Sequence, residues 1–197
     1  ILLSFFSVSL LFYSSNFLSA LLLLFTICFY FFVYTVWLKR RTVQNIVIGG
    51  AAGALPPVIG WTVVTGSLSL EPLILFLIIF LWTPSHFWAL SLYKSKDYKK
   101  AKIPMLPVIY GQEKTKKNIF LYSILMLPVV SAPYYLNFAS NVYFFPSLIL
   151  TIYYTYLCAS LVKTKKNKIS NFIAKKIFVF SIFYLFSIFL LIFINNF

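Results

Sequence analysis

The chain has 197 residues, of which 61% are hydrophobic, 21% aromatic and 10% charged, and its mean hydropathy is +0.92. Because this number of polar side chains is too small to cover the surface of a water-soluble domain of this length, the composition predicts a polytopic membrane protein. The formal net charge of +14 would suggest nucleic acid in a soluble chain. In a membrane protein the positions of the basic residues indicate topology first, and we expect no nucleic-acid partner.

Seven segments approach the roughly 20 apolar residues that a helix needs to cross the hydrocarbon core. They are residues 1–13, 17–38, 46–64, 72–92, 118–136, 142–162 and 172–194. The first begins at Ile1 with no basic region or cleavage site before it, so we interpret it as truncated and the chain as the C-terminal part of a longer protein. The predicted fold is an all-α integral membrane protein in which residues 1–197 form one incomplete domain.

The basic residues fall into three groups, and the connections between these groups contain none. All 17 lie within residues 39–41, 94–117 and 163–176, whereas residues 14–16, 65–71 and 137–141 have no Lys or Arg. By the positive-inside rule, the three basic connections share the cytoplasmic or matrix side of the membrane. The alternation requires every segment to cross, so it supports the number of spans as well as their orientation.

The third span, residues 46–64, is rich in small residues and contains two consecutive prolines. The run from Gly49 to Ala54 includes a Gly-x-x-x-Gly spacing, which lets helix backbones approach closely. Pro56 and Pro57 then interrupt the helical hydrogen bonds. Two interpretations stay open: the glycines serve close packing alone, or the irregular backbone lines a cavity.

The fourth span carries His86, the single histidine of the chain. Pro84 should kink this helix. An ionisable group at membrane depth is a candidate for a functional site, and the alternative is an imidazole bonded to a neighbouring backbone carbonyl. If the helix continues beyond the membrane, Tyr93 and Asp97 lie on the same face as His86.

The second basic connection contains eight lysines and Asp97, the only aspartate of the chain. Pro104 and Pro107 exclude a long regular helix there. Asp97 is either a surface carboxylate in an ion pair that contributes little, or part of a site for a polyanion. In such a site lysines contact phosphate oxygens and the carboxylate helps to hold Mg²⁺.

A polar cluster also precedes the third span; it consists of Lys39, Arg40, Arg41, Thr42, Gln44 and Asn45. Three consecutive cations at the end of a span are either anchors or part of a binding site, because arginine forks suit phosphate and carboxylate groups. The last basic connection, residues 163–176, contains no Asp, Glu, His or Arg. We interpret it as an anchor.

Three blocks closely resemble the heme O synthases, the protoheme IX farnesyltransferase branch of the UbiA prenyltransferase superfamily. They are KRRTVQNIVIGGAAGALPPVIG at residues 39–60, LWTPSHFWAL at residues 81–90 and YKSKDYKKAKIPMLP at residues 93–107. The blocks come in the family's order and spacing. Two positions depart from the wider pattern: Ala101 stands where many superfamily members have a second aspartate, although the heme O synthase branch typically has alanine too, and Ser85 replaces the second proline of TPPH.

The resemblance implies a bundle of nine helices around a central cavity, of which this chain holds the last seven. It implies transfer of the farnesyl group of farnesyl diphosphate to a vinyl group of heme B, which makes heme O on the route to heme A, with Mg²⁺ as cofactor. The implied catalytic residues are Asp97, Tyr93 and His86, and Asp97 would hold Mg²⁺ together with aspartates upstream of this chain. The implied substrate-binding residues are Arg40, Arg41, Asn45, Lys94 and Lys102.

The same resemblance implies that His86, Tyr93 and Asn45 line the cavity, with Trp82, Phe87, Trp88 and Tyr93 available as its aromatic walls. The implied partners are heme B, farnesyl diphosphate, the lipid bilayer and heme A synthase. The implied location is the inner membrane of a bacterium in preference to that of a mitochondrion. We expect the chain alone to be inactive, because it lacks the first aspartate-rich motif of the family.

Two alternatives stay open. One is a prenyltransferase of the same superfamily with another aromatic acceptor, such as a quinone precursor or a chlorophyllide. The other is a transporter or a structural subunit of a respiratory complex, which predicts charged or polar residues deep in several spans. Only His86 meets that description.

Overall fold

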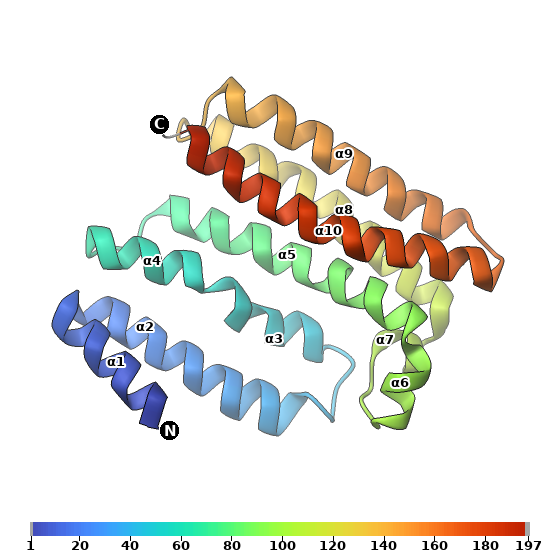
Figure 1. The fold of residues 1–197 in the computed structure, drawn as a ribbon, viewed down its shortest axis with the longest axis horizontal. Coiled ribbons are helices and arrows are strands. Elements are labelled where there is room, and N and C mark those ends of the chain that lie inside the picture. Colours follow the sequence, from blue (N-terminus) through green and yellow to red (C-terminus); the bar gives the residue numbers. More distant parts are fainter. Residues whose placement is uncertain (1, 196–197) are drawn as a thin grey trace.

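The computed structural model describes residues 2–195, and every regular element in that range is a helix (Figure 1), as expected for an all-α membrane protein. In chain order these are α1 (Leu2–Ser14), α2 (Phe17–Cys28), η1 (Phe29–Leu38), α3 (Asn45–Ala54), α4 (Pro56–Thr65), α5 (Leu70–Tyr93), α6 (Ser95–Lys100), α7 (Leu106–Ile109), α8 (Gly111–Tyr135), α9 (Asn141–Lys163) and α10 (Asn167–Asn195).

Six helical segments are long and apolar enough to cross a membrane. They are Phe17–Leu38, Asn45–Thr65, Leu70–Tyr93, Gly111–Tyr135, Asn141–Lys163 and Asn167–Asn195. The first of the seven expected spans is α1, a helix of 13 residues, and Ile1 lies outside the described residues. At about 1.5 Å per residue α1 is about 20 Å long, which is less than the ~30 Å hydrocarbon core. The chain is a multi-pass membrane protein with six helices of spanning length and one shorter helix.

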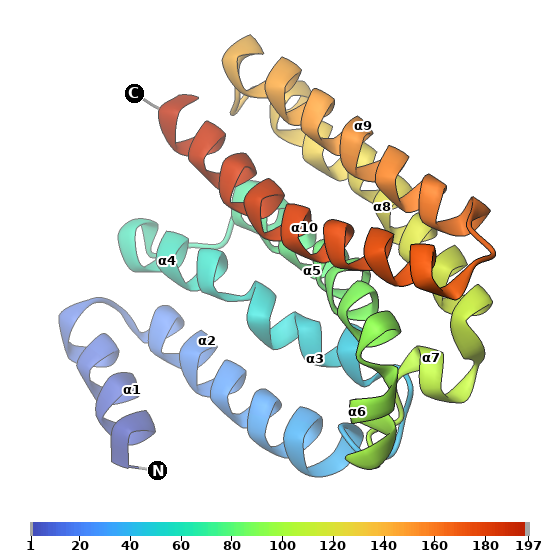
Figure 2. The same cartoon turned by 45° about the vertical axis from the view of Figure 1, so that its right-hand side comes forward.

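All three basic connections lie at the same end of the bundle (Figures 1 and 2). These connections are the turn between η1 and α3, the segment that contains α6 and α7, and the turn between α9 and α10. The connections without basic residues lie at the opposite end. The helices are therefore arranged as the charge pattern predicts.

This arrangement predicts the result of cysteine labelling from the two sides of the membrane. In a background without Cys28 and Cys158, we expect Lys99→Cys and Lys166→Cys to react with a membrane-impermeant maleimide from the cytoplasmic side, where basic loops are retained. Ser67→Cys, in the exposed turn before α5, should react only from the other side. Labelling of Ser67→Cys and Lys99→Cys from one side would show that the order of crossings is wrong.

Two consecutive prolines divide the third span, as predicted. Helix α3 ends at Ala54 and α4 begins at Pro56. Pro84, in contrast, lies within the continuous helix α5. Because a proline at the first position of a helix needs no hydrogen bond from its nitrogen, Pro56 begins α4 without a lost bond.

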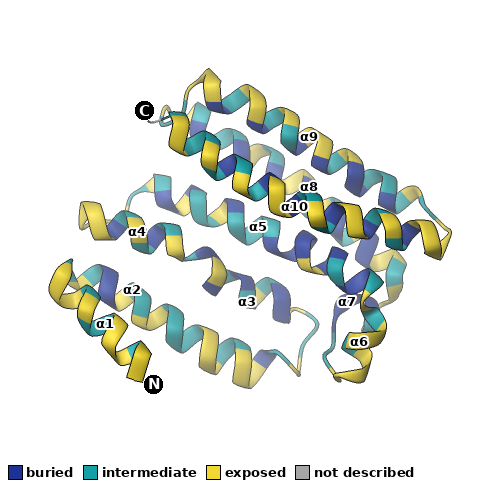
Figure 3. Ribbon diagram, in the orientation of Figure 1, coloured by how far each residue is buried: buried dark blue, intermediate teal, exposed yellow. Residues whose placement is uncertain are grey.

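Helix α5 lies at the centre of the bundle and packs against α3, α4, α8 and α10. Figure 3 shows buried residues along α5 and exposed residues on the outer faces of α1, α9 and α10. Polar side chains inside the bundle bond to one another: Ser85 to Tyr154 at 2.8 Å, and Thr151 to Tyr184 at 2.9 Å. Such pairs satisfy groups that no water in the hydrocarbon core would satisfy.

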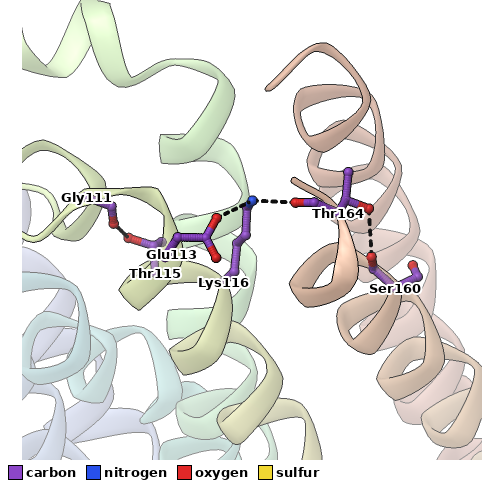
Figure 4. Close-up of polar contacts among 6 residues, drawn as sticks. All are labelled: Gly111, Glu113, Thr115, Lys116, Ser160 and Thr164. Carbon is purple, nitrogen blue, oxygen red and sulfur yellow. Dashed lines mark hydrogen bonds and ion pairs between the residues drawn. The ribbon is translucent and has the colours of Figure 1, made fainter. Parts of the chain in front are cut away.

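The basic end of α8 is tied to the end of α9 by a buried lysine (Figure 4). The side chain of Lys116 is only 1% exposed. Its ammonium donates hydrogen bonds to Glu113 Oε1 at 2.9 Å and to the backbone carbonyl of Thr164 at 2.8 Å. Because Thr164 is the C-terminal cap of α9, this lysine satisfies a carbonyl that the helix leaves without an intrahelical partner.

Candidate active site

A cavity of about 250 Å³ lies between η1, α3 and α5. Its lining is aromatic, aliphatic or glycine apart from Thr83: Tyr30, Tyr34, Ile46, Gly49, Gly50, Gly53, Ile79, Trp82, Thr83 and Phe87. A concave, mostly apolar space with few polar groups is the usual setting of a small-molecule site. This cavity is therefore the candidate for the apolar part of an active site.

Two tyrosines reach the cavity from a π-helix. In η1 the backbone hydrogen bonds join residues five apart, as the 2.8 Å bond from Lys39 N to the Tyr34 carbonyl shows. The rings of Tyr30 and Tyr34, four residues apart, lie 5.3 Å from each other. Such helices are rare and are frequent at functional sites. The wide turn of η1 keeps both tyrosines on one wall of the cavity.

The glycines of α3 serve both roles that the sequence left open. A Cβ at Gly50 would lie 2.9 Å from Thr83 Cγ2, and a Cβ at Gly49 would collide with the Tyr34 ring. Both glycines therefore allow close packing, of α3 on α5 and of the Tyr34 ring on α3. Both also line the cavity, as does Gly53.

The basic end of the bundle adjoins this cavity. The Tyr98 side chain on α6 lies near Tyr34, which lines the cavity, and near Tyr93 at the end of α5. Partial burial raises the pKa of Tyr98, so this phenol stays protonated at neutral pH. The Lys39 ammonium lies 6.0 Å from the centroid of the Tyr34 ring. Residues of both basic connections thus approach the same tyrosine.

Asn45 braces the turn that carries Arg40 and Arg41. Its side chain is buried, and its amide donates a 3.1 Å hydrogen bond to the carbonyl of Lys39. The Asn45 Oδ1 atom is buried and has no hydrogen-bond partner among residues 2–195. Arg40 and Arg41 are exposed, and neither forms an ion pair within the described part of the chain.

Asp97 does not share a helical face with His86, because α5 ends at Tyr93. Lys94 leaves the helical conformation (φ −102°, ψ 16°), and Asp97 lies in the first turn of the separate helix α6. Its carboxylate is 64% exposed and lies 3.4 Å from the Lys94 ammonium. An exposed pair of this kind contributes at most about 1 kcal/mol to stability. Its geometry matches the surface ion pair that the sequence left open, and it places Lys94 beside Asp97.

Lys102 occupies a position that favours glycine. It follows the last turn of α6 with φ +55°, and the N–H groups of Lys102 and Ile103 bond to the carbonyls of Lys99 and Tyr98. These two bonds form a Schellman motif, in which the left-handed residue is usually glycine. A lysine in this conformation costs roughly 1–2 kcal/mol, so the turn holds an exposed cation in a strained position.

His86 is not among the residues that line the cavity, contrary to expectation, and neither are Tyr93 and Asn45. The imidazole is 6% exposed and stacks between Trp82 and Phe178, with ring centroids 4.2 and 4.5 Å away. Its Nδ1 lies 2.6 Å from Ser181 Oγ, and Ser181 donates its own proton to the Phe178 carbonyl. His86 Nδ1 therefore donates to the serine, and its partner is a hydroxyl, not the backbone carbonyl of the alternative interpretation.

The carboxylates of the chain are too far apart to form a magnesium site by themselves. Among residues 2–195 no three His, Cys, Asp or Glu side chains come together. Glu113 is paired with Lys116, and Glu71 begins α5 at the opposite end of the bundle. Mg²⁺ prefers six oxygen ligands, and α6 supplies only Asp97. The described residues therefore do not fit a complete magnesium site.

The sequence did not single out Tyr30 and Tyr34, because aromatic residues make up 21% of the chain. The signal that it did offer is their spacing of four ahead of the glycine-rich α3. Trp82 and Phe87 line the cavity as expected. Trp88 does not; it is buried in the core and makes an edge contact with Tyr122.

Comparison with known proteins identifies relatives over nearly the whole chain. Residues 1–185 match the model of the UbiA prenyltransferase family. A protein of Pelagibacter ubique named protoheme IX farnesyltransferase is 65% identical over 98% of this chain and 64% of its own length. Proteins with the same name from Parvibaculum lavamentivorans and Rickettsia bellii are 51% and 50% identical over 92% and 98% of this chain.

The chain spans less than two thirds of the length of these relatives: 64%, 57% and 63%, respectively. No solved structure matches it.

Proposed function

Because this chain belongs to the UbiA prenyltransferase family, we propose that it forms part of an enzyme that transfers the farnesyl group of farnesyl diphosphate to a vinyl group of heme B, making heme O. The observation that carries the proposal is the aromatic cavity between η1, α3 and α5 that adjoins two exposed basic connections. An allylic diphosphate has the matching form, with an anionic head and an apolar tail. The shared name of the relatives supports heme B as the acceptor.

The basic end would bind the diphosphate. Arg40, Arg41, Lys94 and Lys102 are exposed cations on the two connections, and guanidinium and ammonium groups form strong charge-assisted hydrogen bonds to phosphate oxygens. When the bond between the farnesyl carbon and oxygen breaks, both electrons leave with the diphosphate. Cations fixed at that position stabilise the developing negative charge more in the transition state than in the bound substrate.

The cavity would hold the farnesyl chain and exclude water from the carbocation. Tyr30, Tyr34, Trp82 and Phe87 line it, and the faces of aromatic rings attract cations. A dry site prevents hydrolysis of the farnesyl cation before the vinyl π electrons form the new carbon–carbon bond. The carbocation that this leaves on the other vinyl carbon would then take up one water molecule and release a proton. His86 would support this wall by holding Trp82, on which it stacks, and Tyr93 would stand at its basic end.

Further parts of the proposal concern the cofactor, the partners and the location. We expect Mg²⁺ to accompany the diphosphate, with Asp97 contributing one ligand and the other carboxylates coming from residues outside this chain. Heme A synthase is the expected recipient of the product. The bacterial origin of the relatives favours the bacterial inner membrane over the mitochondrial one.

The test is the formation of heme O by mass spectrometry. The chain is expressed alone, and also joined to the part of the Pelagibacter ubique relative that it does not cover, in cells without their own heme O synthase. We expect product from the joined protein and none from the chain alone, because the 197 residues contain three acidic side chains, too few and too far apart to bind magnesium diphosphate. Transfer of farnesyl to a quinone precursor instead of heme would overturn the acceptor.

Lys102→Gly should separate stability from binding in the joined protein. Glycine adopts the left-handed conformation freely, so the apparent Tm should stay the same or rise. The KM for farnesyl diphosphate should rise roughly tenfold, because a charge-assisted hydrogen bond contributes about 1.5–3 kcal/mol. Lys100→Gln removes an exposed charge from the same helix and is the control. An unchanged KM for Lys102→Gly would mean that Lys102 does not contact the diphosphate.

A further inference from the structure

Gly53 differs from the other two glycines that line the cavity. Packing accounts for Gly49 and Gly50, where a Cβ would meet Tyr34 or Thr83. At Gly53 a Cβ would have no heavy atom of the described structure within 4 Å. Glycine within a helix is about 1 kcal/mol less favourable than alanine, and packing within residues 2–195 gives no reason for a glycine here.

Gly53 also lies at the end of the cavity away from the cations. One face of α3 lines the cavity through four residues at helical spacing: Ile46, Gly49, Gly50 and Gly53. Ile46 is next to Asn45, at the basic end of α3. Gly53 is seven residues farther along, about 10 Å at the rise of an α-helix. A chain whose head is held at the basic end would extend along this face toward Gly53.

We propose that Gly53 sets the length of the prenyl chain that the cavity accepts. The missing side chain leaves space for the last isoprene unit of a farnesyl group, and a larger residue at this position fills that space. The proposal rests on the proposed function, because it places the diphosphate at the basic end. It goes further in naming the residue that distinguishes a fifteen-carbon from a ten-carbon donor.

The experiment uses the joined protein and compares geranyl diphosphate with farnesyl diphosphate. Both donors are tested in two ways: by transfer to heme B, and by calorimetric binding without heme. Gly53→Ala, Gly53→Val and Gly53→Leu form a series of increasing volume. Gly60→Leu is the matched control, since a Cβ at Gly60 of α4 also meets no atom within 4 Å and Gly60 is not among the residues that line this cavity.

We expect Gly53→Leu to weaken the binding of farnesyl diphosphate at least about tenfold relative to that of geranyl diphosphate, because the excluded isoprene unit is no longer buried against apolar surface. Gly53→Val should have an intermediate effect, and Gly53→Ala and Gly60→Leu should have little effect. Equal effects on both donors, or no effect at Gly53, would overturn the proposal. If the unmodified protein makes no heme O, the proposed acceptor fails. The ratio of the two binding constants still tests Gly53, and the alanine and valine variants provide it if the leucine variant does not fold.

Discussion

Asp97→Asn should lower heme O formation by the joined protein roughly a hundredfold, the effect expected when one group that stabilises developing charge is removed. Asp97 is the only carboxylate on α6, and it lies 3.4 Å from Lys94. Its loss removes the counter-charge that positions this lysine. It also removes the one carboxylate that α6 would offer to a divalent cation bound with the diphosphate. The measurement is the initial rate of heme O formation at saturating heme B.

The stability of the Asp97→Asn protein should stay the same, because asparagine has the same shape and the exposed ion pair contributes at most about 1 kcal/mol. Lys166→Gln is the control, since Lys166 is exposed in the turn between α9 and α10 and should not alter the rate. If both variants lower the rate slightly and equally, Asp97 is only a surface charge.

Lys116→Ala should destabilise the protein by about 2–4 kcal/mol, the range for losing a buried stem together with its hydrogen bonds. The change deletes a side chain that is 1% exposed and two hydrogen bonds, to Glu113 and to the Thr164 carbonyl. The end of α9 then loses the donor that caps it. The apparent Tm in detergent and the denaturant midpoint are the measurements.

Two further variants identify the cause of this effect. Lys117→Ala removes the exposed neighbouring lysine and should change stability by no more than about 0.5 kcal/mol. Lys116→Met keeps the apolar stem and removes the ammonium. Its loss of stability should therefore lie between those of Lys116→Ala and Lys117→Ala. If the changes at positions 116 and 117 have equal effects, the contact with Thr164 contributes nothing.

The main features of the fold follow from the sequence by simple physical rules. Span lengths and the segregation of 17 basic residues predicted seven crossing segments, of which six are helices of spanning length, and placed all three basic connections at one end. Pro56 correctly divided the third span. The ends of helices were less predictable: α8 begins at Gly111, seven residues before the expected start, because a helix can carry Lys114 and Lys117 once it has left the hydrocarbon core.

The candidate site was harder to predict, because it depends on contacts between distant residues. No local pattern shows that Ser181 binds His86 and draws its ring toward α10, away from the cavity that it was expected to line. The end of α5 at Tyr93 removes Asp97 from the predicted face. Lys116 resembles its exposed neighbours in sequence, and what distinguishes it in the structure is its burial against Thr164, the C-terminal cap of α9. The two tyrosines of the cavity wall depend on the π-helical turn of η1.

Side-chain hydrogen bonds divide the bundle into two parts. Asn16 and Ser19 bond to Thr62 and so join α2 to α4, whereas His86, Ser85 and Tyr184 join α5, α9 and α10. Between α3 and α5 no side-chain hydrogen bond forms within residues 2–195, and Gly50 meets Thr83 by van der Waals contact alone. Within lipid, breaking a polar contact between helices leaves its groups without partners. The joint along which the two parts can slide without that penalty is the one that contains the cavity, so the cavity can change its width without breaking a side-chain hydrogen bond between helices.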